Sequence, residues 1–418
     1  MKQTYLYFQP EYVSKFKCNG QICSAHCCKK WRIDVDKKTY KKWSHIKPKS
    51  ESEKIIKNIF KNDDNKYIFK LDEKKRCPLL TEDNWCSVQK KYGEEYLSNV
   101  CVTYPRITYL LGNFFERSLS LTCPVVAAQV LLNDEPMVFE QIEVSEKIHS
   151  NLGRIGMNRA PVPQNLLNHI FSIQFAAISI LQSRNLSIDG RLIMLGFFLD
   201  KLDEIISADK LEKIENLTAV YSSEKFLTDE APDLIEIMNF DVKEHMKIIF
   251  GTFEALYGGN SNFVRDDQKL IDAFVDTFEI TVNENNRISV DSVAKIYEQL
   301  DKFRKTFINH FSTVFENYLV NEFFLNLYPW KFQNSIIHNY GIFLTTYKML
   351  ELIALSFAVS NFKKDPKKIP PLSKIDLSAI TMMFANNLDH NKVYAEKISE
   401  HLKDKDDVIF LMQSLLQR

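Results

Sequence analysis

Cysteine is the residue type whose placement in this chain points most clearly to chemistry. All eight cysteines of the 418-residue chain lie within the first 123 residues: Cys18, Cys23, Cys27, Cys28, Cys77, Cys86, Cys101 and Cys123. Disulfide frameworks are typical of short secreted chains, whereas this long chain begins without the apolar core and cleavage site of a signal peptide. We therefore expect a cytoplasmic protein with reduced thiolates around a metal. Buried thiols or disulfides are the alternatives.

Four of the thiols lie within eleven residues, in the pattern Cys18-x4-Cys23-x3-Cys27-Cys28-x2-Trp31. Thiolates suit zinc and iron–sulfur clusters, both of which take four soft ligands. Eight thiols could fill two such sites, or one site with the others buried as small apolar groups. Since neighbouring side chains diverge, Cys27 and Cys28 are awkward as joint ligands of one metal ion. They fit better if they bind different irons or different sites, or if one of them is structural. Spacing alone does not choose between zinc and iron.

The downstream cysteines stand in short motifs that carry a family resemblance: Cys77-Pro-Leu-Leu, Trp85-Cys86, Cys101-x2-Tyr104-Pro-Arg106 and Cys123-Pro. With the leading Pro10-Glu-Tyr12 and the late run Glu316-Asn-Tyr-Leu-Val-Asn321, the sequence resembles the bacterial flagellin lysine-N-methylase family (FliB). The resemblance covers essentially the whole chain, and the cysteine segment is its most specific part. That segment is also similar to the broader CxxCxxCC-type metal-chelating proteins, although its first two gaps are longer.

Membership of this family implies a protein-lysine N-methyltransferase that moves methyl groups from S-adenosylmethionine to flagellin lysines. It also implies an iron–sulfur cluster of the 4Fe-4S type in the cysteine region, with zinc as the alternative metal. The eight cysteines carry over as candidate ligands, without showing which four bind a given cluster. The C-x3-C-x2-C pattern of radical enzymes is not matched, because Lys30 stands where its third cysteine would be. The competing hypothesis is a non-catalytic, metal-binding interaction protein.

Methylation of an amine requires a neutral nitrogen aligned behind the methyl carbon, and a lysine starts near a pKa of about 10.4. A site must therefore desolvate the lysine or accept its proton, and aromatic faces would hold the sulfonium. Tyr104 and Arg106 lie beside Cys101 and could orient the carboxylate of the methyl donor or order the cluster region. A second candidate group lies in a helical run: Tyr318, Asn321 and Glu322. The structural alternative for Tyr104 and Arg106 is a tyrosine packed beside a proline turn with an exposed arginine. The alternative for the second group is ordinary packing in an aromatic core. No catalytic base is identified.

The elements that must position these residues are predicted to be mainly α-helical. We expect a cysteine-rich module of turns and short helices over 1–130, an α-helical domain over 131–418 and a charged, proline-bearing linker at 363–371. Apolar residues repeat at helical spacing over 166–206, which predicts an antiparallel hairpin, and again over 269–278, 290–327, 335–360 and 377–416. Strands do not alternate with helices, and no glycine-rich nucleotide motif is present, so a Rossmann-type domain is not expected.

Charge and hydropathy limit the classes of partner. The chain holds 54 Lys plus Arg and 54 Asp plus Glu, which argues against a nucleic-acid binder held by bulk charge. Residues 1–125 contain 24 basic and 14 acidic residues, so this segment carries +10 and the rest −10. The simplest explanation of this charge difference is two solvated surfaces of opposite net charge. The alternatives are that the two halves dock on each other, or that an acidic groove in the second half attracts a cationic substrate.

Lys348 and Glu351 interrupt the apolar stretch 340–362, so we expect a buried helix rather than membrane insertion.

Overall fold

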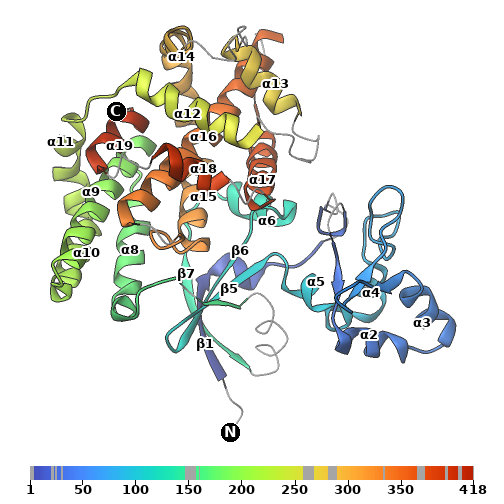
Figure 1. Cartoon of the computed structure of the whole chain (residues 1–418). Helices are drawn as coiled ribbons and strands as arrows, with labels where there is room; N and C mark the ends of the chain where they lie inside the picture. Colours follow the sequence, from blue (N-terminus) through green and yellow to red (C-terminus); the bar gives the residue numbers. More distant parts are fainter. Residues whose placement is uncertain are drawn as a thin grey trace. The chain divides into compact units, whose positions relative to one another are not determined.

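The computed structural model describes residues 4–19, 23, 26–29, 32–145, 157–159, 161–257, 268–280, 290–332, 335–364, 372–390, 394–402 and 407–417. The chain forms two compact units, which are coloured along the sequence in Figure 1. The first comprises Met1–Gln129 with Val138–Ala160, and the second comprises Val130–Met137 with Pro161–Arg418. Helices dominate the described elements, so the prediction of a mainly α fold is confirmed. Of the predicted linker, residues 365–371 lie outside the described residues.

The first unit is built on a five-stranded mixed sheet of order β7-β1-β6-β5-β8. β6 runs parallel to β1 and antiparallel to β5, while β7 and β8 form the two edges. The strands are β1 (Thr4–Pro10), β5 (Arg106–Leu111), β6 (Phe114–Leu119), β7 (Phe139–Ser145) and β8 (Met157–Arg159). All six residues of β6 are buried, so this central strand has no solvent-facing side.

A smaller part of the first unit is inserted between β1 and β5 and carries most of the cysteines. Its strands form a three-stranded sheet of order β2-β4-β3. Its elements are α1 (Glu11–Lys15), η1 (His26–Cys28), β2 (Asp34–Val35), α2 (Lys37–Ser44), α3 (Lys49–Ile56), β3 (Ile59–Lys61), β4 (Tyr67–Phe69), α4 (Ser87–Tyr92), η2 (Glu94–Tyr96) and α5 (Asn99–Thr103). α6 (Pro124–Leu131) follows the last cysteine. Asp36 caps α2, because its carboxylate accepts the Thr39 amide at 2.9 Å.

The prediction of turns and short helices for the cysteine-rich region was therefore incomplete, since it missed both sheets. The reason lies in the burial pattern of the strands. A half-buried strand alternates apolar and polar residues, but β6 is buried on both faces and includes Glu116 and Arg117. The smaller strands β2, β3 and β4 are only two or three residues long, too short for a periodic signal.

The second unit is a helical assembly, and its hairpin confirms the prediction for 166–206. α8 (Ile170–Leu181) and α9 (Ile188–Ser207) pack against each other, and Ser187 caps α9 by accepting the Gly190 amide at 3.1 Å. The remaining elements are η3 (Gln164–Leu166), η4 (Leu211–Lys213), α10 (Ile214–Tyr221), η5 (Phe226–Glu230), α11 (Ala231–Glu236), α12 (Val242–Tyr257), α13 (Gln268–Thr277), α14 (Val290–His310), α15 (Ser312–Leu325), α16 (Ile336–Lys364), α17 (Lys374–His390), α18 (Tyr394–His401) and α19 (Val408–Leu415). The apolar run predicted over 290–327 is divided between α14 and α15.

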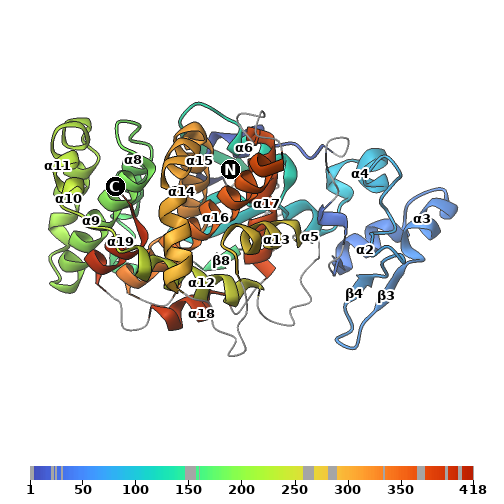
Figure 2. The same cartoon turned by 90° about the horizontal axis from the view of Figure 1, so that it is seen from above.

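α16 is the central helix of the second unit and contacts α9, α12, α13, α17, α18 and α19 (Figure 2). It is the one helix in the described ranges long and apolar enough to cross a membrane, and 94% of its apolar window is buried inside the protein. Tyr340 on this helix donates a hydrogen bond to the Leu192 carbonyl at 2.7 Å. Gly196 permits this approach, because a Cβ there would lie 2.5 Å from the Tyr340 hydroxyl oxygen.

Candidate functional site

All eight cysteines line one pocket of the first unit, although 105 positions separate the first from the last. Every one of them is a free thiol. The cavity measures about 80 Å³, several times the ~10–15 Å³ that holds one water molecule. The structure thus brings the sequence-predicted ligand set to a single place with room for a group larger than one water.

Backbone hydrogen bonds hold the distant cysteine segments together. The Cys77 amide donates to the Cys28 carbonyl at 2.7 Å. The loop between Cys77 and α4 is closed by the Ser87 amide, which donates to the Leu79 carbonyl at 2.8 Å. Cys101 is part of α5, and its thiol accepts a hydrogen bond from the Ser98 hydroxyl at 3.2 Å. The pocket wall is therefore made of short elements tied to one another rather than of one continuous motif.

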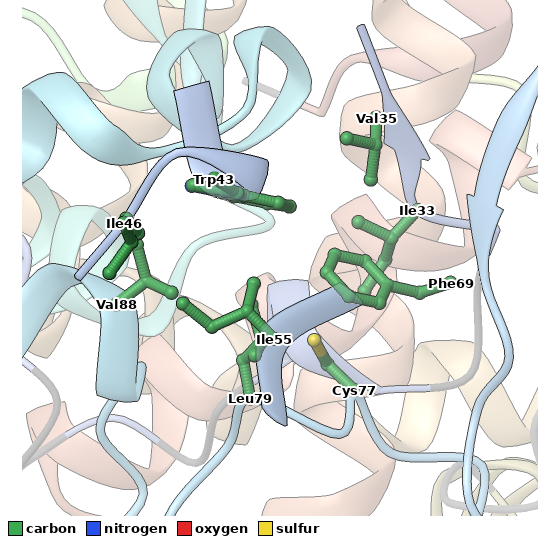
Figure 3. Close-up of a cluster of buried hydrophobic side chains, with 9 residues drawn as sticks. All are labelled: Ile33, Val35, Trp43, Ile46, Ile55, Phe69, Cys77, Leu79 and Val88. Carbon is green, nitrogen blue, oxygen red and sulfur yellow. The ribbon is translucent and has the colours of Figure 1, made fainter. Parts of the chain in front are cut away.

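An apolar cluster supports this wall and includes one of the cysteines (Figure 3). Cys77 is 6% exposed and belongs to the cluster, whose other buried members are Ile33, Val35, Trp43, Ile46, Ile55, Phe69, Leu79 and Val88. The Trp43 indole donates to the Tyr96 carbonyl at 2.7 Å, which ties α2 to η2. Cys77 thus belongs to a packed core, and Cys28, Cys86 and Cys101 pack against it, so the positions of these four thiols depend on the folding of the inserted part.

Burial raises the pKa of several of these thiols. It raises the pKa of Cys18 and Cys123 to about 11 each, and that of Cys101 to about 12, with smaller contributions from neighbouring cysteines. For Cys27 the largest cause of the raised pKa is the contact with the Cys28 sulfur 3.8 Å away. A cation in the pocket would oppose these shifts, because metal binding displaces thiol protons.

The donor set fits a thiophilic metal or cluster by its chemistry, since eight thiols converge on one cavity. Across the described ranges, no three His, Cys, Asp or Glu side chains lie together at the spacing of a bound metal ion. The identity of the ligands to any one centre therefore stays a prediction.

Tyr104 and Arg106 line the same pocket as the cysteines. The Tyr104 hydroxyl lies 3.1 Å from the Thr122 hydroxyl. Arg106 donates to the Val102 carbonyl at 3.0 Å and lies 3.6 Å from the Glu94 carboxylate. Burial lowers the pKa of Arg106, while Glu94 opposes that shift. Both residues predicted to orient the methyl donor are thus part of the pocket wall, where their side chains are already partly ordered by protein contacts.

The second predicted group lies elsewhere, in α15 of the second unit. Tyr318 is 1% exposed and Asn321 is 0% exposed. Glu322 accepts a hydrogen bond from Asn326 and lies 3.5 Å from the Lys331 ammonium. None of these three side chains lines the cysteine pocket, so their role in binding the substrate or methyl donor stays a separate prediction.

Sequence reasoning missed a buried ionic cluster in the second unit. Lys348 on α16 donates to Asp189 at 2.6 Å and to Glu351 at 2.8 Å. Arg304 donates to the same two carboxylates, to Asp189 at 2.7 Å and to Glu351 at 2.6 Å. All four side chains are at most 5% exposed. Lys348 and Glu351 were visible in the sequence as charges within an apolar helix, and that was the signal that could have identified this cluster.

Comparison with known proteins identifies the family. Residues 174–416 match the model of the FliB lysine N-methylase C-terminal domain. The chain is 30% identical over 212 residues to lysine-N-methylases of Salmonella typhimurium and Salmonella choleraesuis, a match that covers 50% of this chain and 49% of each relative. It therefore spans about half the length of these curated relatives.

A third relative is the flagellar biosynthetic protein FliU of Salmonella muenchen, which is 37% identical over 150 residues. That match covers 35% of this chain and 88% of FliU. No solved structure matches the chain. The family model extends over more than half of the residues, and the chain therefore belongs to the FliB lysine N-methylase family.

Proposed function

We propose that this protein is a cytoplasmic protein-lysine N-methyltransferase that transfers methyl groups from S-adenosylmethionine to lysine side chains of flagellin. The proposal further places an iron–sulfur cluster in the cysteine pocket. Its main structural support is the convergence of all eight cysteines with Tyr104 and Arg106 on one cavity. The names of the relatives, lysine-N-methylase and a flagellar biosynthetic protein, support the reaction and the kind of substrate.

The transfer forms a bond between the lysine nitrogen and the methyl carbon and breaks the bond between that carbon and sulfur. The lysine proton must leave beforehand, because only the neutral amine has a free electron pair. Residues of the pocket wall suit the positioning part of this task. The Arg106 guanidinium can bind the donor's carboxylate, and the aromatic faces of Phe16 and Trp85 can contact a sulfonium.

The same wall can also assist with the lysine proton. Glu94 lines the cavity and is exposed, so it can attract the ammonium on approach. The apolar lining beside it, including Leu97 and Val125, would then disfavour the charged form by desolvation. Glu94 is our candidate for the group that receives the proton, directly or through water.

The resident cluster would tie the separate cysteine segments to one another when bound, since metal-binding free energy in such modules is also folding free energy. Methyl transfer consumes no electrons, so a structural role for the cluster is sufficient. The chain's own residues contribute a pocket wall that is held in a fixed arrangement around the cluster site. The Cys77–Cys28 backbone hydrogen bond and the Trp43 anchor already hold that wall in place.

The test is a methylation assay with anaerobically reconstituted protein, purified flagellin and methyl-labelled S-adenosylmethionine. We expect label on lysines, and we expect Arg106→Gln to reduce the rate. Arg32→Gln is the matched control, because Arg32 is about half exposed and forms an ion pair with the equally exposed Asp34 at 2.7 Å. Persistent absence of label with verified metal content would instead favour a non-catalytic metal-binding protein.

A further inference from the structure

Arg117, on the central strand β6, is a buried cation that has no role in the reaction proposed above. It is 4% exposed. Its guanidinium carbon lies 4.0 Å from the centroid of the Tyr7 ring, and its Nε donates to the Thr108 hydroxyl at 3.2 Å. The side chain is therefore held between β1 and β5 by two neutral residues, Tyr7, which offers its ring face and a hydrogen bond, and Thr108.

Within the described ranges, no Asp or Glu forms an ion pair with Arg117, and its Nη2 has no hydrogen-bond partner. The neighbouring Glu116 projects from the opposite face of the strand, because successive side chains alternate. Burial lowers the pKa of Arg117 to about 10, which still leaves it protonated at neutral pH. A buried charge without a partner is costly, and such groups are normally paired.

A second arginine lies diagonally across from it on the same face of the sheet. Thr108 is opposite Arg117 in the β5–β6 register, and Arg106 is opposite Leu119. Since residues two apart share a face, Arg106 and Arg117 are diagonal neighbours on adjacent strands. The two positive charges repel each other, and this repulsion contributes to the lowered pKa of Arg117. Arg106 reaches the cysteine pocket.

We propose that Arg117, backed by Tyr7 and Thr108, is a carboxylate-binding subsite next to the Arg106 wall of the cysteine pocket, and that its ligand is the carboxylate of the methyl donor. The assignment rests on the function proposed above. A guanidinium offers a planar pair of donors that matches a carboxylate, and a bound anion would compensate both arginines. An acidic side chain of the protein substrate carries the same chemistry, and the experiment separates the two sources.

The experiment measures binding of S-adenosylhomocysteine and of its decarboxylated analogue to the anaerobically purified full chain by calorimetry. For the natural protein we expect loss of the carboxylate to weaken binding roughly 10- to 100-fold. In Arg117→Gln this ratio should fall several-fold, because Arg106 then remains as the single cationic partner of the carboxylate, whereas the exposed control Arg32→Gln should keep the full ratio. An Arg117→Gln protein that retains the full ratio overturns the assignment.

Two further outcomes are informative. If Arg117→Gln leaves the ratio intact but raises the KM for flagellin, the carboxylate comes from the substrate protein and our assignment to the methyl donor is wrong. If the natural protein binds neither compound, the proposed function fails together with the subsite. Should Arg117→Gln not fold, Arg117→Lys keeps the cation but loses the paired donors, and it should still lower the ratio. An unchanged ratio in that variant contradicts the proposal.

Discussion

The Cys77 amide donates a hydrogen bond to the Cys28 carbonyl at 2.7 Å, although 49 positions separate the two residues. The adjacent isolated bridge between Lys29 and Arg76 extends this pairing by one residue. Two of the candidate ligand segments are thus joined through their backbones, independently of any bound group. This pairing brings the segments that contain Cys28 and Cys77 together at one cavity.

Replacing Cys77 by Ser should remove bound iron and lower the melting temperature of the metal-loaded protein, because the thiol is both a candidate ligand and a member of the core. Metal analysis and thermal unfolding on the same sample measure the two effects. Val88→Ala is the matched control, since it removes apolar volume from the same cluster without removing a thiol. Cys77→Ser protein that keeps its full iron content would exclude Cys77 as a ligand.

Removing one charge from the buried ionic cluster should cost far more than removing one from the surface. Lys348→Met leaves Asp189 and Glu351 sharing Arg304 alone, and we expect a loss of about 3–5 kcal/mol in the free energy of unfolding. Chemical denaturation measures this loss. Combining Lys348→Met with Glu351→Leu restores charge balance and should lose less than the single change.

The control for that series is Lys201→Gln. Lys201 lies 2.8 Å from Glu204, and both side chains are more than half exposed. The expected loss is below about 1 kcal/mol. Equal losses for Lys348→Met and Lys201→Gln would show that the buried cluster contributes no more than an exposed pair.

Stability should fall in mild acid because of His245. Burial, and then the nearby Lys348 and Arg304, lower the pKa of this imidazole, while its Nδ1 lies 3.1 Å from the Ser414 carbonyl. The folded protein keeps His245 neutral, whereas the unfolded chain takes up a proton below a pKa of about 6.5. The free energy of unfolding should therefore decrease as pH falls below that value, by up to about 1.4 kcal/mol per pH unit for this group.

Denaturation curves at several pH values test this expectation. His245→Asn retains a nitrogen donor near the Ser414 carbonyl but no longer titrates, so its stability should depend less on pH between about 7.5 and 5.5. His45→Asn, which changes an exposed histidine, provides the comparison. An identical pH dependence in the natural protein and His245→Asn would contradict this prediction.

Arg106→Gln should raise the KM for S-adenosylmethionine by roughly 10-fold, since a charge-assisted hydrogen bond to the donor's carboxylate is lost. Steady-state kinetics with saturating flagellin measures the effect, and Arg32→Gln should leave KM unchanged. A lower kcat with an unaltered KM would instead indicate that Arg106 does not contact the donor in the ground state.

The sequence predicted those features that depend on residue type and local periodicity. Helical spacing predicted α8, α9, α13 and α16, and the clustering of the cysteines in the sequence indicated that they act together, which agrees with their position around one pocket. The five-stranded sheet was missed because its central strand is buried on both faces and includes Arg117, so it shows no alternation.

Long-range pairings also lay beyond the sequence. Lys348 stood out as a charge in an apolar helix, but its partner Asp189 is 159 positions away, and nothing in a local pattern joins them. Likewise, Arg106 could be placed near Cys101 from adjacency, whereas its relation to Arg117 depends on the register of β5 and β6. Both relationships are tertiary, and local patterns carry no information on them.

The most direct test of the central claim is the metal and sulfide content of anaerobically purified protein, measured with its visible absorption spectrum. The account predicts iron and acid-labile sulfide in comparable amounts and a broad visible band from iron–thiolate charge transfer, both lost when pocket cysteines are replaced. Stoichiometric zinc without iron or sulfide, in colourless protein, would contradict the assignment of an iron–sulfur cluster to the cysteine pocket.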